Sequence, residues 1–248
     1  MTELTYEHPL NEKLRTYLRL EYLLSQLYSL QALDGEWQQQ AFFNTLFDLI
    51  EVLDRNDIRP DLIKDCERCE TALVAWANHP SVSDDKLQPV LQQAVRLQSE
   101  LLRSNKFVGN LKDDKFLAPL RQRFAIPGGT CYFDVPQLHY WLNLPQSERS
   151  YMAEQWCAEF SLLQQAVSFV LGFSRQKGQF TDVTADNGFY QSNTDQHELL
   201  RIRYPLQAGV YPTVSGNKYR YAIRFMQLSD DSGRCSSEKT ICFQLASC

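Results

Sequence analysis

Two stretches of the chain carry basic side chains and no carboxylate. No Asp or Glu occurs from Leu199 to Ser229 or from Lys115 to Phe133. A guanidinium can donate two parallel hydrogen bonds to one carboxylate, so arginine suits the binding of an anionic partner. The pattern therefore predicts a site for such a partner. The alternative is a solvated strand face whose charges pair with acids of the N-terminal half. The basic residues of the two stretches are Lys115, Arg121, Arg123, Arg201, Arg203, Lys218, Arg220 and Arg224.

The spacing of the later residues predicts strands that hold the charges on one face. In residues 218–225, apolar side chains alternate with Lys218, Arg220, Ala222 and Arg224. Successive side chains of a strand point to opposite faces, so the three basic residues share one face and the aromatic residues take the buried one. Residues 200–206 show the same alternation, with two arginines on the polar face.

Local catalytic motifs are missing from the sequence. It has no G-x-S-x-G, P-loop or H-E-x-x-H motif, and its four histidines lie far apart along the chain. We therefore expect a protein that is not an enzyme and that needs no metal or cofactor. One alternative stays open, namely an enzyme whose site is assembled from distant residues such as Cys131, Asp134 and His139.

The seven cysteines are odd in number and irregularly spaced. Cys66 and Cys69 form one C-x-x-C, but no second Cys or His pair follows at the spacing of a zinc site. A metal or redox role for this pair is the less favoured interpretation. The first residues lack a basic start and an apolar core, and no apolar stretch approaches the ~20 residues of a membrane span. These features predict a cytoplasmic protein with reduced thiols and no membrane association.

The distribution of charge separates the two halves of the chain. The net charge of −5 opposes general nucleic-acid binding, which needs a basic surface to neutralise phosphates. Residues 1–115 hold 13 Lys or Arg against 19 Asp or Glu, whereas residues 116–248 hold 12 against 11. A basic site in the second half would therefore lie in a protein that is acidic elsewhere.

Hydrophobic periodicity predicts an α+β fold. Apolar residues recur at helical spacing in the first half, which predicts helices over residues 9–33, 36–55, from 57 or 60 to 79, and 83–102. Ser83 is the expected N-cap of the fourth, and His79-Pro80 ends the third. The second half favours β-structure at 130–133 and 139–142, a helix at about 148–176, and alternating strands at 200–206, 219–225 and 241–245.

These elements predict two domains. An N-terminal helical bundle domain covers residues 8–115 and is joined by helices from 146–176. An antiparallel β-rich, barrel-like domain covers residues 116–248 and contains the inserted helical segment. In this arrangement the β-rich domain holds all six arginines of the two acid-free stretches.

Several short segments, taken in order, resemble the ZapD family of bacterial division-ring factors. The opening residues 7–21 are similar to the start of these proteins, and so are Leu120-Arg121-Gln122-Arg123-Phe124 and the turn at 126–129. Further likeness lies in Phe133-Asp134, Leu138-His139-Tyr140-Trp141-Leu142, Asn187-Gly188-Phe189-Tyr190-Gln191, Tyr211-Pro212, Ser215-Gly216, Ala222-Ile223-Arg224-Phe225-Met226 and Cys248. Residues 28–110 match mainly in helical pattern.

The resemblance implies a function that needs no catalysis. Members of the family are cytoplasmic homodimers that bind the C-terminal tail of FtsZ, the tubulin-like division GTPase, and cross-link its filaments at the midcell ring. The contact is expected to use basic residues. A lysine stands at 115, where an arginine is expected, and its ammonium group lacks the planar fork that gives arginine its bidentate contact. A polyanion or nucleic-acid binding module that uses the basic strand face is the alternative. The residues that the resemblance implies are Arg19, Arg55, Lys115, His139, Arg220 and Arg224.

Overall fold

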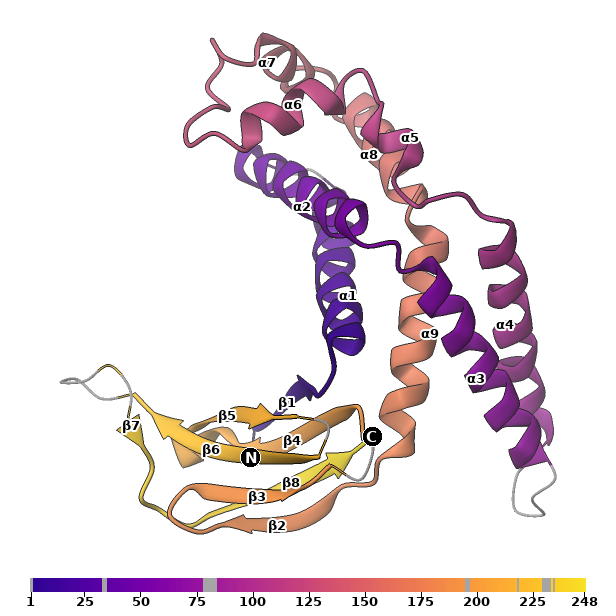
Figure 1. Ribbon diagram of the computed structural model, residues 1–248. Helices are drawn as coiled ribbons and strands as arrows, with labels where there is room; N and C mark the ends of the chain where they lie inside the picture. The colour runs from indigo at the N-terminus through magenta and orange to yellow at the C-terminus, as the bar shows by residue number, and fades with distance from the viewer. Residues whose placement is uncertain are drawn as a thin grey trace. The chain divides into compact units, whose positions relative to one another are not determined.

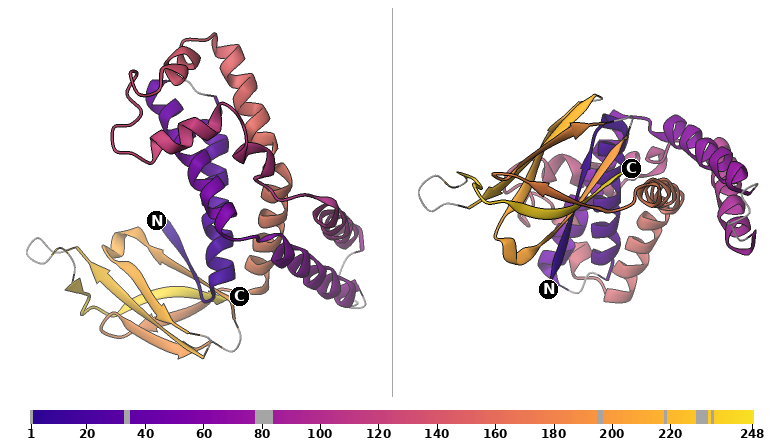
Figure 2. Two further views of the ribbon diagram at one scale, coloured as in Figure 1. Left: turned by 45° about the horizontal axis from the view of Figure 1, so that its top comes forward. Right: turned by 90° about the horizontal axis from the view of Figure 1, so that it is seen from below.

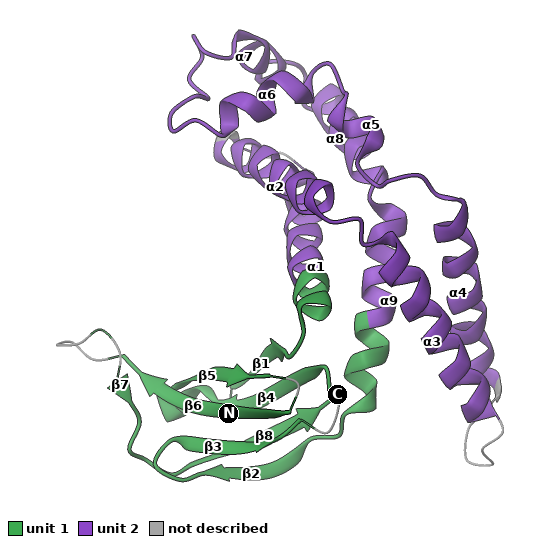
Figure 3. Ribbon diagram, viewed as in Figure 1, with its two compact units in different colours: residues 1–18, 171–248 green, residues 19–170 purple. Residues whose placement is uncertain are grey.

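The computed structural model describes residues 2–32, 35–77, 84–194, 197–217, 219–228, 233 and 235–248. It has the predicted α+β class, with helices first and antiparallel strands after them (Figure 1). Lys218, the predicted helix end at His79-Pro80 and the predicted N-cap Ser83 lie outside the described residues. The chain divides into two compact units, which comprise residues 1–18 with 171–248 and residues 19–170 (Figure 3).

Helices build the unit of residues 19–170, which we call the helical unit. The first four confirm the helices predicted for the first half of the chain. None of the helices within the described ranges is long and apolar enough to cross a membrane. The helices are α1 (Glu12–Leu30), α2 (Glu36–Arg55), α3 (Arg59–Ala77), α4 (Asp84–Arg103), α5 (Gly109–Lys112), α6 (Leu117–Phe124), α7 (Pro136–Leu142), α8 (Gln146–Ala158) and α9 (Ser161–Lys177), of which α1 and α9 cross the boundary between the units.

An aromatic core holds the helical unit together. The Phe43 ring of α2 lies 5.2 Å from the Trp141 ring, 5.8 Å from the Trp156 ring and 5.9 Å from the Phe124 ring, measured between centroids. Such pairs stabilise by about 0.5–1.5 kcal/mol each beyond their buried area. Phe43 thereby fixes α6, α7 and α8 against α2. Helices α3 and α4 instead pack mainly against each other, side by side in the views of Figures 1 and 2.

The β-structure predicted for residues 130–133 and 139–142 is wrong. The first segment forms turns, and the second belongs to α7. Pro136 stands at the start of this helix, where its fixed φ suits helical geometry and its missing N–H costs nothing. Leu138 and Trp141, three residues apart, then share one buried face. Burial against the aromatic core overrides the β propensity of the aromatic residues, and residues 116–170 fall in the helical unit.

Two antiparallel sheets form the other unit, which we call the β unit. One has the strand order β1-β4-β8-β2 and the other the order β3-β6-β5, with the short β7 also paired to β6 (strands labelled in Figure 1, further views in Figure 2). The strands are β1 (Glu3–Pro9), β2 (Thr181–Ala185), β3 (Phe189–Asn193), β4 (Leu199–Pro205), β5 (Tyr211–Gly216), β6 (Arg220–Gln227), β7 (Cys235–Ser236) and β8 (Ile241–Ser247).

One apolar cluster joins the two sheets. Ile202 of β4 and Phe243 of β8 belong to the first sheet, and Ile223 and Phe225 of β6 belong to the second. The Phe225 and Phe243 rings meet edge to face at 5.1 Å. The alternation predicted for the strands at 200–206, 219–225 and 241–245 is thus confirmed, because their apolar residues face this shared core. Tyr219 and Leu206 are exceptions. Tyr219 lies ahead of β6 and is 69% exposed, and Leu206 lies after β4, in the short 3-10 helix η1 (Leu206–Ala208), and is 52% exposed.

Strand β1 was not predicted, because the sequence pattern placed the first helix at Pro9. It pairs with β4 so that Glu7 lies opposite Arg201. The Glu7 carboxylate also accepts hydrogen bonds from Arg175 of α9 at 2.7 and 2.9 Å and from Arg201 Nε at 2.9 Å. All three side chains are at most one quarter exposed. This ion network ties the end of α9 to the first sheet within the β unit.

His8 makes stability of the β unit depend on pH. Partial burial, together with the positive charge of Arg15, lowers the pKa of His8 below its ordinary value of 6.5. The unfolded chain therefore takes up a proton here at a higher pH than the folded chain does. The stability that neutral His8 contributes is complete above pH 6.5 and is lost as the pH falls through the lowered pKa. We expect urea unfolding to show a smaller loss of stability between pH 7 and pH 5 for His8→Gln than for the wild type; equal losses would contradict this assignment.

Candidate functional site

The outer face of the β3-β6-β5 sheet gathers two of the predicted arginines. Along β6, Arg220 and Arg224 are exposed, whereas Tyr221, Ile223 and Phe225 between them are buried. This confirms the predicted parity of the strand. The register places the following neighbours on the same outer face, which we call the basic sheet face: Phe189, Gln191, Asn193, Tyr211, Thr213, Ser215, Ala222 and Met226. None of these described residues carries a carboxylate.

Arg224 is held in place by neighbours that leave its charge available. Its guanidinium lies 5.2 Å from the centre of the Phe189 ring on β3, and Nη1 lies 3.3 Å from Ser236 Oγ. A ring under a guanidinium orients it without neutralising it. Arg224 forms no ion pair with any residue that the structure describes. The Arg224 guanidinium can therefore donate hydrogen bonds to a carboxylate of a binding partner.

Arg220 lines a hollow of about 740 Å³ on the same face. The turn before it is closed by Asn217, whose N–H donates to Arg220 O at 2.9 Å and whose Oδ1 accepts from Arg220 N at 3.1 Å. Like Arg224, Arg220 has no ion-pair partner within the described ranges. The neutral polar residues Gln191, Asn193, Ser215 and Asn217 also line the hollow. A guanidinium among neutral donors and acceptors can bind a carboxylate or a phosphate.

Arg201 and Arg203 do not belong to this face. They lie on β4 in the other sheet, where Arg201 pairs with Glu7 and Arg203 Nε lies 3.9 Å from Glu3 Oε2. The Arg203 guanidinium also lies 3.9 Å from the centre of the Phe180 ring. These two arginines therefore follow the alternative interpretation, in which the basic residues pair with acids of the N-terminal half. The acids lie on β1 and not on the helices.

In the helical unit, Arg19 of α1 and Arg55 of α2 line one hollow of about 340 Å³. Arg55 pairs with Glu51 one turn earlier on the same helix. Arg19 is exposed and forms no ion pair with the described residues. Asp48 also lines this hollow, and burial, followed by the charge of Glu51, raises its pKa. The arrangement offers both signs of charge.

A second hollow, of about 630 Å³, adjoins the first and shares Asp48, Glu51 and Arg55 with it. Arg121 of α6 lines it and lies 3.9 Å from Asp54. Asp54 also accepts a hydrogen bond from Lys112 Nζ at 2.8 Å, which is the main reason why its pKa is lowered.

The remaining predicted residues of the helical unit lie apart from both hollows. Arg123 faces Asp134 at 3.8 Å. Lys115 is exposed and unpaired among the described residues. The exposed His139 ring lies 4.3 Å from the Tyr132 ring.

The structure therefore sorts the predicted residues into two groups. Arg19, Arg55 and Arg121 line the adjoining hollows of the helical unit, and Arg220 and Arg224 lie on the basic sheet face of the β unit. Sequence reasoning missed Gln191, Asn193 and Asn217, which line the hollow beside Arg220. Neutral amides leave no signal in a charge pattern, and only the strand register brings them to the arginine.

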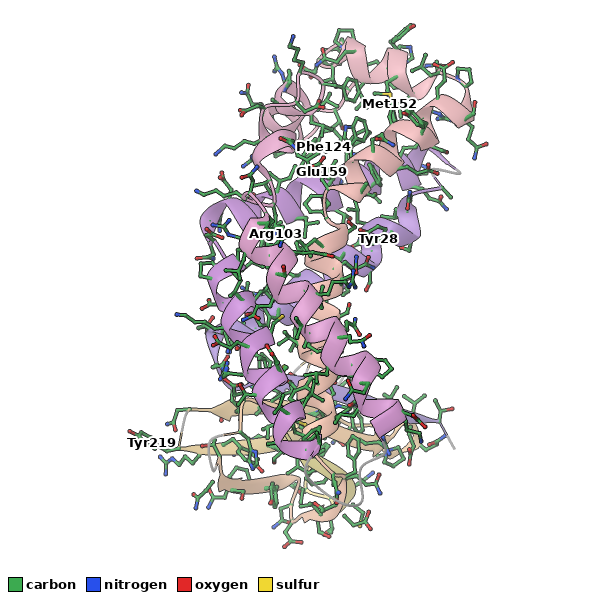
Figure 4. All side chains as sticks on the ribbon, turned by 90° about the vertical axis from the view of Figure 1, so that its right-hand side faces the viewer. Tyr28, Arg103, Phe124, Met152, Glu159 and Tyr219 are labelled. Atoms are coloured by element: carbon green, nitrogen blue, oxygen red, sulfur yellow. The ribbon has the colours of Figure 1, made fainter. Side chains whose placement is uncertain are left out.

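The described part of the chain holds no cluster of metal-ligating side chains. No three His, Cys, Asp or Glu side chains lie there in a position to hold a metal ion. Cys66 and Cys157 are buried, and burial raises the pKa of each thiol to about 12. Beside Cys157, Tyr28 (labelled in Figure 4) donates its hydroxyl to the Cys157 carbonyl at 3.1 Å. These two thiols serve as apolar core groups.

Comparison with known proteins shows which family the chain belongs to. A family model described as "ZapD: Cell division protein" matches residues 18–224. Two proteins named "Cell division protein ZapD", from Vibrio vulnificus (strain CMCP6) and Yersinia enterocolitica, are 40% and 41% identical to the chain and are aligned over the full length of both partners. A third of that name, from Vibrio atlanticus, is 41% identical over 98% of each chain. The matches define the class as cell division proteins. The chain belongs to the ZapD family.

Proposed function

We propose that this protein binds the C-terminal tail of FtsZ and cross-links FtsZ filaments, which promotes assembly of the Z-ring at midcell. The observation that carries the proposal is the basic sheet face, where Arg220 and Arg224 are exposed and have no carboxylate beside them. Membership of a cell division family supports an FtsZ-related role. The protein would act in the cytoplasm as a homodimer, by binding alone and without a cofactor.

Cross-linking follows from bivalence. One exposed charge pair contributes only about 0.2–1 kcal/mol, so a single tail would bind weakly. A two-fold dimer carries two identical sites, and the first contact with a filament raises the effective concentration of tails at the second. Such avidity reaches a factor of roughly 10² to 10⁴ when both sites can be occupied together. A filament that displays many tails is the target that this mode of binding suits.

Arg19, Arg55 and Arg121 give the helical unit a second surface for the tail. Its hollows also hold Asp48 and Asp54, so this surface suits a segment that carries both signs of charge. We assign the acidic part of the tail to the basic sheet face, because that face has cations alone. Lys115, Arg123, His139 and Lys218 remain supporting candidates.

Salt tests the electrostatic part of the proposal. Raising the ionic strength from about 0.1 M to about 1 M shortens the Debye length from about 10 Å to about 3 Å, which screens exposed charges. We expect the affinity for a fluorescent tail peptide, measured by anisotropy, to fall by roughly tenfold or more. Thermal unfolding at both salt concentrations controls for folding, and a random DNA duplex controls for general polyanion binding. An affinity that is unchanged at molar salt would contradict the proposal.

A further inference from the structure

Strand β5 is an open edge beside the basic sheet face. It pairs with β6 on one side only and ends the order β3-β6-β5 (Figure 1). Edge strands present unpaired N–H and C=O groups, to which an extended peptide can add as a further strand. The direction in which each backbone group points decides whether this edge can do so.

The hydrogen bonds around the hairpin fix those directions. The Asn217 N–H donates to Arg220 O, so the backbone N–H and C=O groups of residue 217 point toward β6. Backbone groups alternate in direction along a strand, so those of Thr213 and Ser215 point toward β6 as well. On the far side of β6, Phe225 N–H donates to Gly188 O, which agrees with this phase. Val214 and Gly216 therefore point their N–H and C=O groups away from the sheet. Within the described ranges neither residue forms another backbone hydrogen bond.

The chemistry of the edges selects β5 for an acidic segment. The β1 edge carries Glu3 and Glu7, and β2 carries Asp182. The β3 edge has no acid, but the N–H of its first residue, Phe189, already donates to Asp186 O at 3.0 Å. Strand β5 has no carboxylate. Pro212 has no N–H to offer, which confines a docked strand to the half of β5 next to the hairpin turn.

We propose that the acidic peptide binds in extended form by adding to β5 as a new edge strand, through the backbone groups of Val214 and Gly216. This inference rests on the proposed function, in that the peptide is the FtsZ tail. Every second side chain of the added strand faces the same way as Thr213 and Ser215, over the basic sheet face. Strand β6 lies about 10 Å away, two strand spacings, a span that an arginine and a glutamate reaching toward each other can bridge. The backbone gives the register, and Arg220 and Arg224 select acids at alternate positions.

Amide hydrogen exchange on the whole protein tests the geometry without any substitution. With saturating synthetic FtsZ tail peptide, the Val214 and Gly216 amides should exchange at least tenfold more slowly, while the outward-facing Gln191 amide of β3 keeps its rate. Binding that leaves Val214 and Gly216 unprotected overturns the edge-strand mode but leaves the proposed function standing. A wild-type protein that does not bind the peptide at all overturns both.

A matched pair of proline variants gives the second measurement. Val214→Pro removes an N–H that faces away from β6. Thr184→Pro does the same on the β2 edge: the Cys248 N–H donates to Leu199 O, so Cys248 and, by alternation, Cys242 face β4, and Thr184 opposite Cys242 points its N–H away from β8. Neither variant breaks a bond of its ladder, and Thr184 lies in the other sheet, outside the basic sheet face. Val214→Pro should weaken peptide binding at least tenfold, and Thr184→Pro should change it less than twofold. Equal affinities of the two variants, or a larger loss for Thr184→Pro, overturn the assignment to β5. Circular dichroism and thermal unfolding show whether each variant is folded. If a variant is unfolded, the hydrogen-exchange experiment on the wild-type protein decides whether the peptide adds to β5.

Discussion

Replacing Arg220 and Arg224 together by alanine is expected to abolish the bundling of FtsZ filaments. An exposed charge pair contributes up to about 1 kcal/mol, so each single variant should lose up to roughly fivefold in affinity for the tail peptide and the double variant up to roughly 30-fold. Bundling needs two occupied sites on one dimer, so it should fall more steeply than the affinity. Anisotropy measures the affinity, and light scattering of polymerised FtsZ measures bundling.

The control for this experiment is Arg103→Ala. Arg103 is an exposed arginine at the end of α4 in the helical unit (Figure 4), so its removal changes net charge by the same amount per residue. It should leave both affinity and bundling within about twofold of the wild type. All variants should keep the wild-type unfolding temperature, because surface substitutions of this kind change stability by only about 0.5 kcal/mol. Equal losses from Arg103→Ala and from the β6 variants would mean that general charge, and not the basic sheet face, binds the tail.

Among substitutions that remove a charged side chain from the β unit, we expect Glu7→Ala to cause the largest loss of stability. Glu7→Ala leaves Arg175 and Arg201 without their shared partner, although both are at least three quarters buried. Breaking a mostly buried ion network costs about 3 kcal/mol, since the two guanidinium groups lose their shared carboxylate while they stay largely out of water. Urea unfolding followed by circular dichroism should show this loss in the transition of the β unit.

Glu12→Ala is the matched control for Glu7→Ala. Glu12 lies 3.5 Å from Arg15, yet its side chain is 83% exposed, so the pair is screened by solvent. Exposed pairs contribute about 0–1 kcal/mol, and we expect a change within that range. A Glu7→Ala variant as stable as Glu12→Ala would show that the network does not hold α9 to the sheet.

Local pattern was enough to predict the helices of the first half and the strands that carry the arginines. The reason is that α1 to α4 and β6 each bury one periodic face, and periodicity is visible in a single segment. Strand β1 shows the limit of that reasoning. It is half-buried and acidic, and its partner β4 lies nearly two hundred residues later, at Arg201 opposite Glu7. Long-range pairing of this kind has no local signal.

The residues of the candidate site also divide into those that a local sequence pattern can predict and those that it cannot. Arg220 and Arg224 were accessible to prediction, because a run without acids and the parity of one strand suffice to find them. The roles of Arg201 and Arg203 were not, since their partners sit on the unpredicted strand β1. The prediction of β-structure at residues 139–142 was wrong for another reason. The buried contacts of Leu138 and Trp141 in α7 outweigh the β propensity of the segment.

Low-speed pelleting of polymerised FtsZ with this protein tests the central claim most directly, when full-length FtsZ is compared with FtsZ that lacks its C-terminal tail. High-speed pelleting first verifies that tail-less FtsZ polymerises under the same conditions, so that a difference at low speed reports bundling alone. We expect bundles that sediment at low speed only with full-length FtsZ. Equal sedimentation with and without the tail, or none with either form, would contradict a protein that cross-links filaments through their tails.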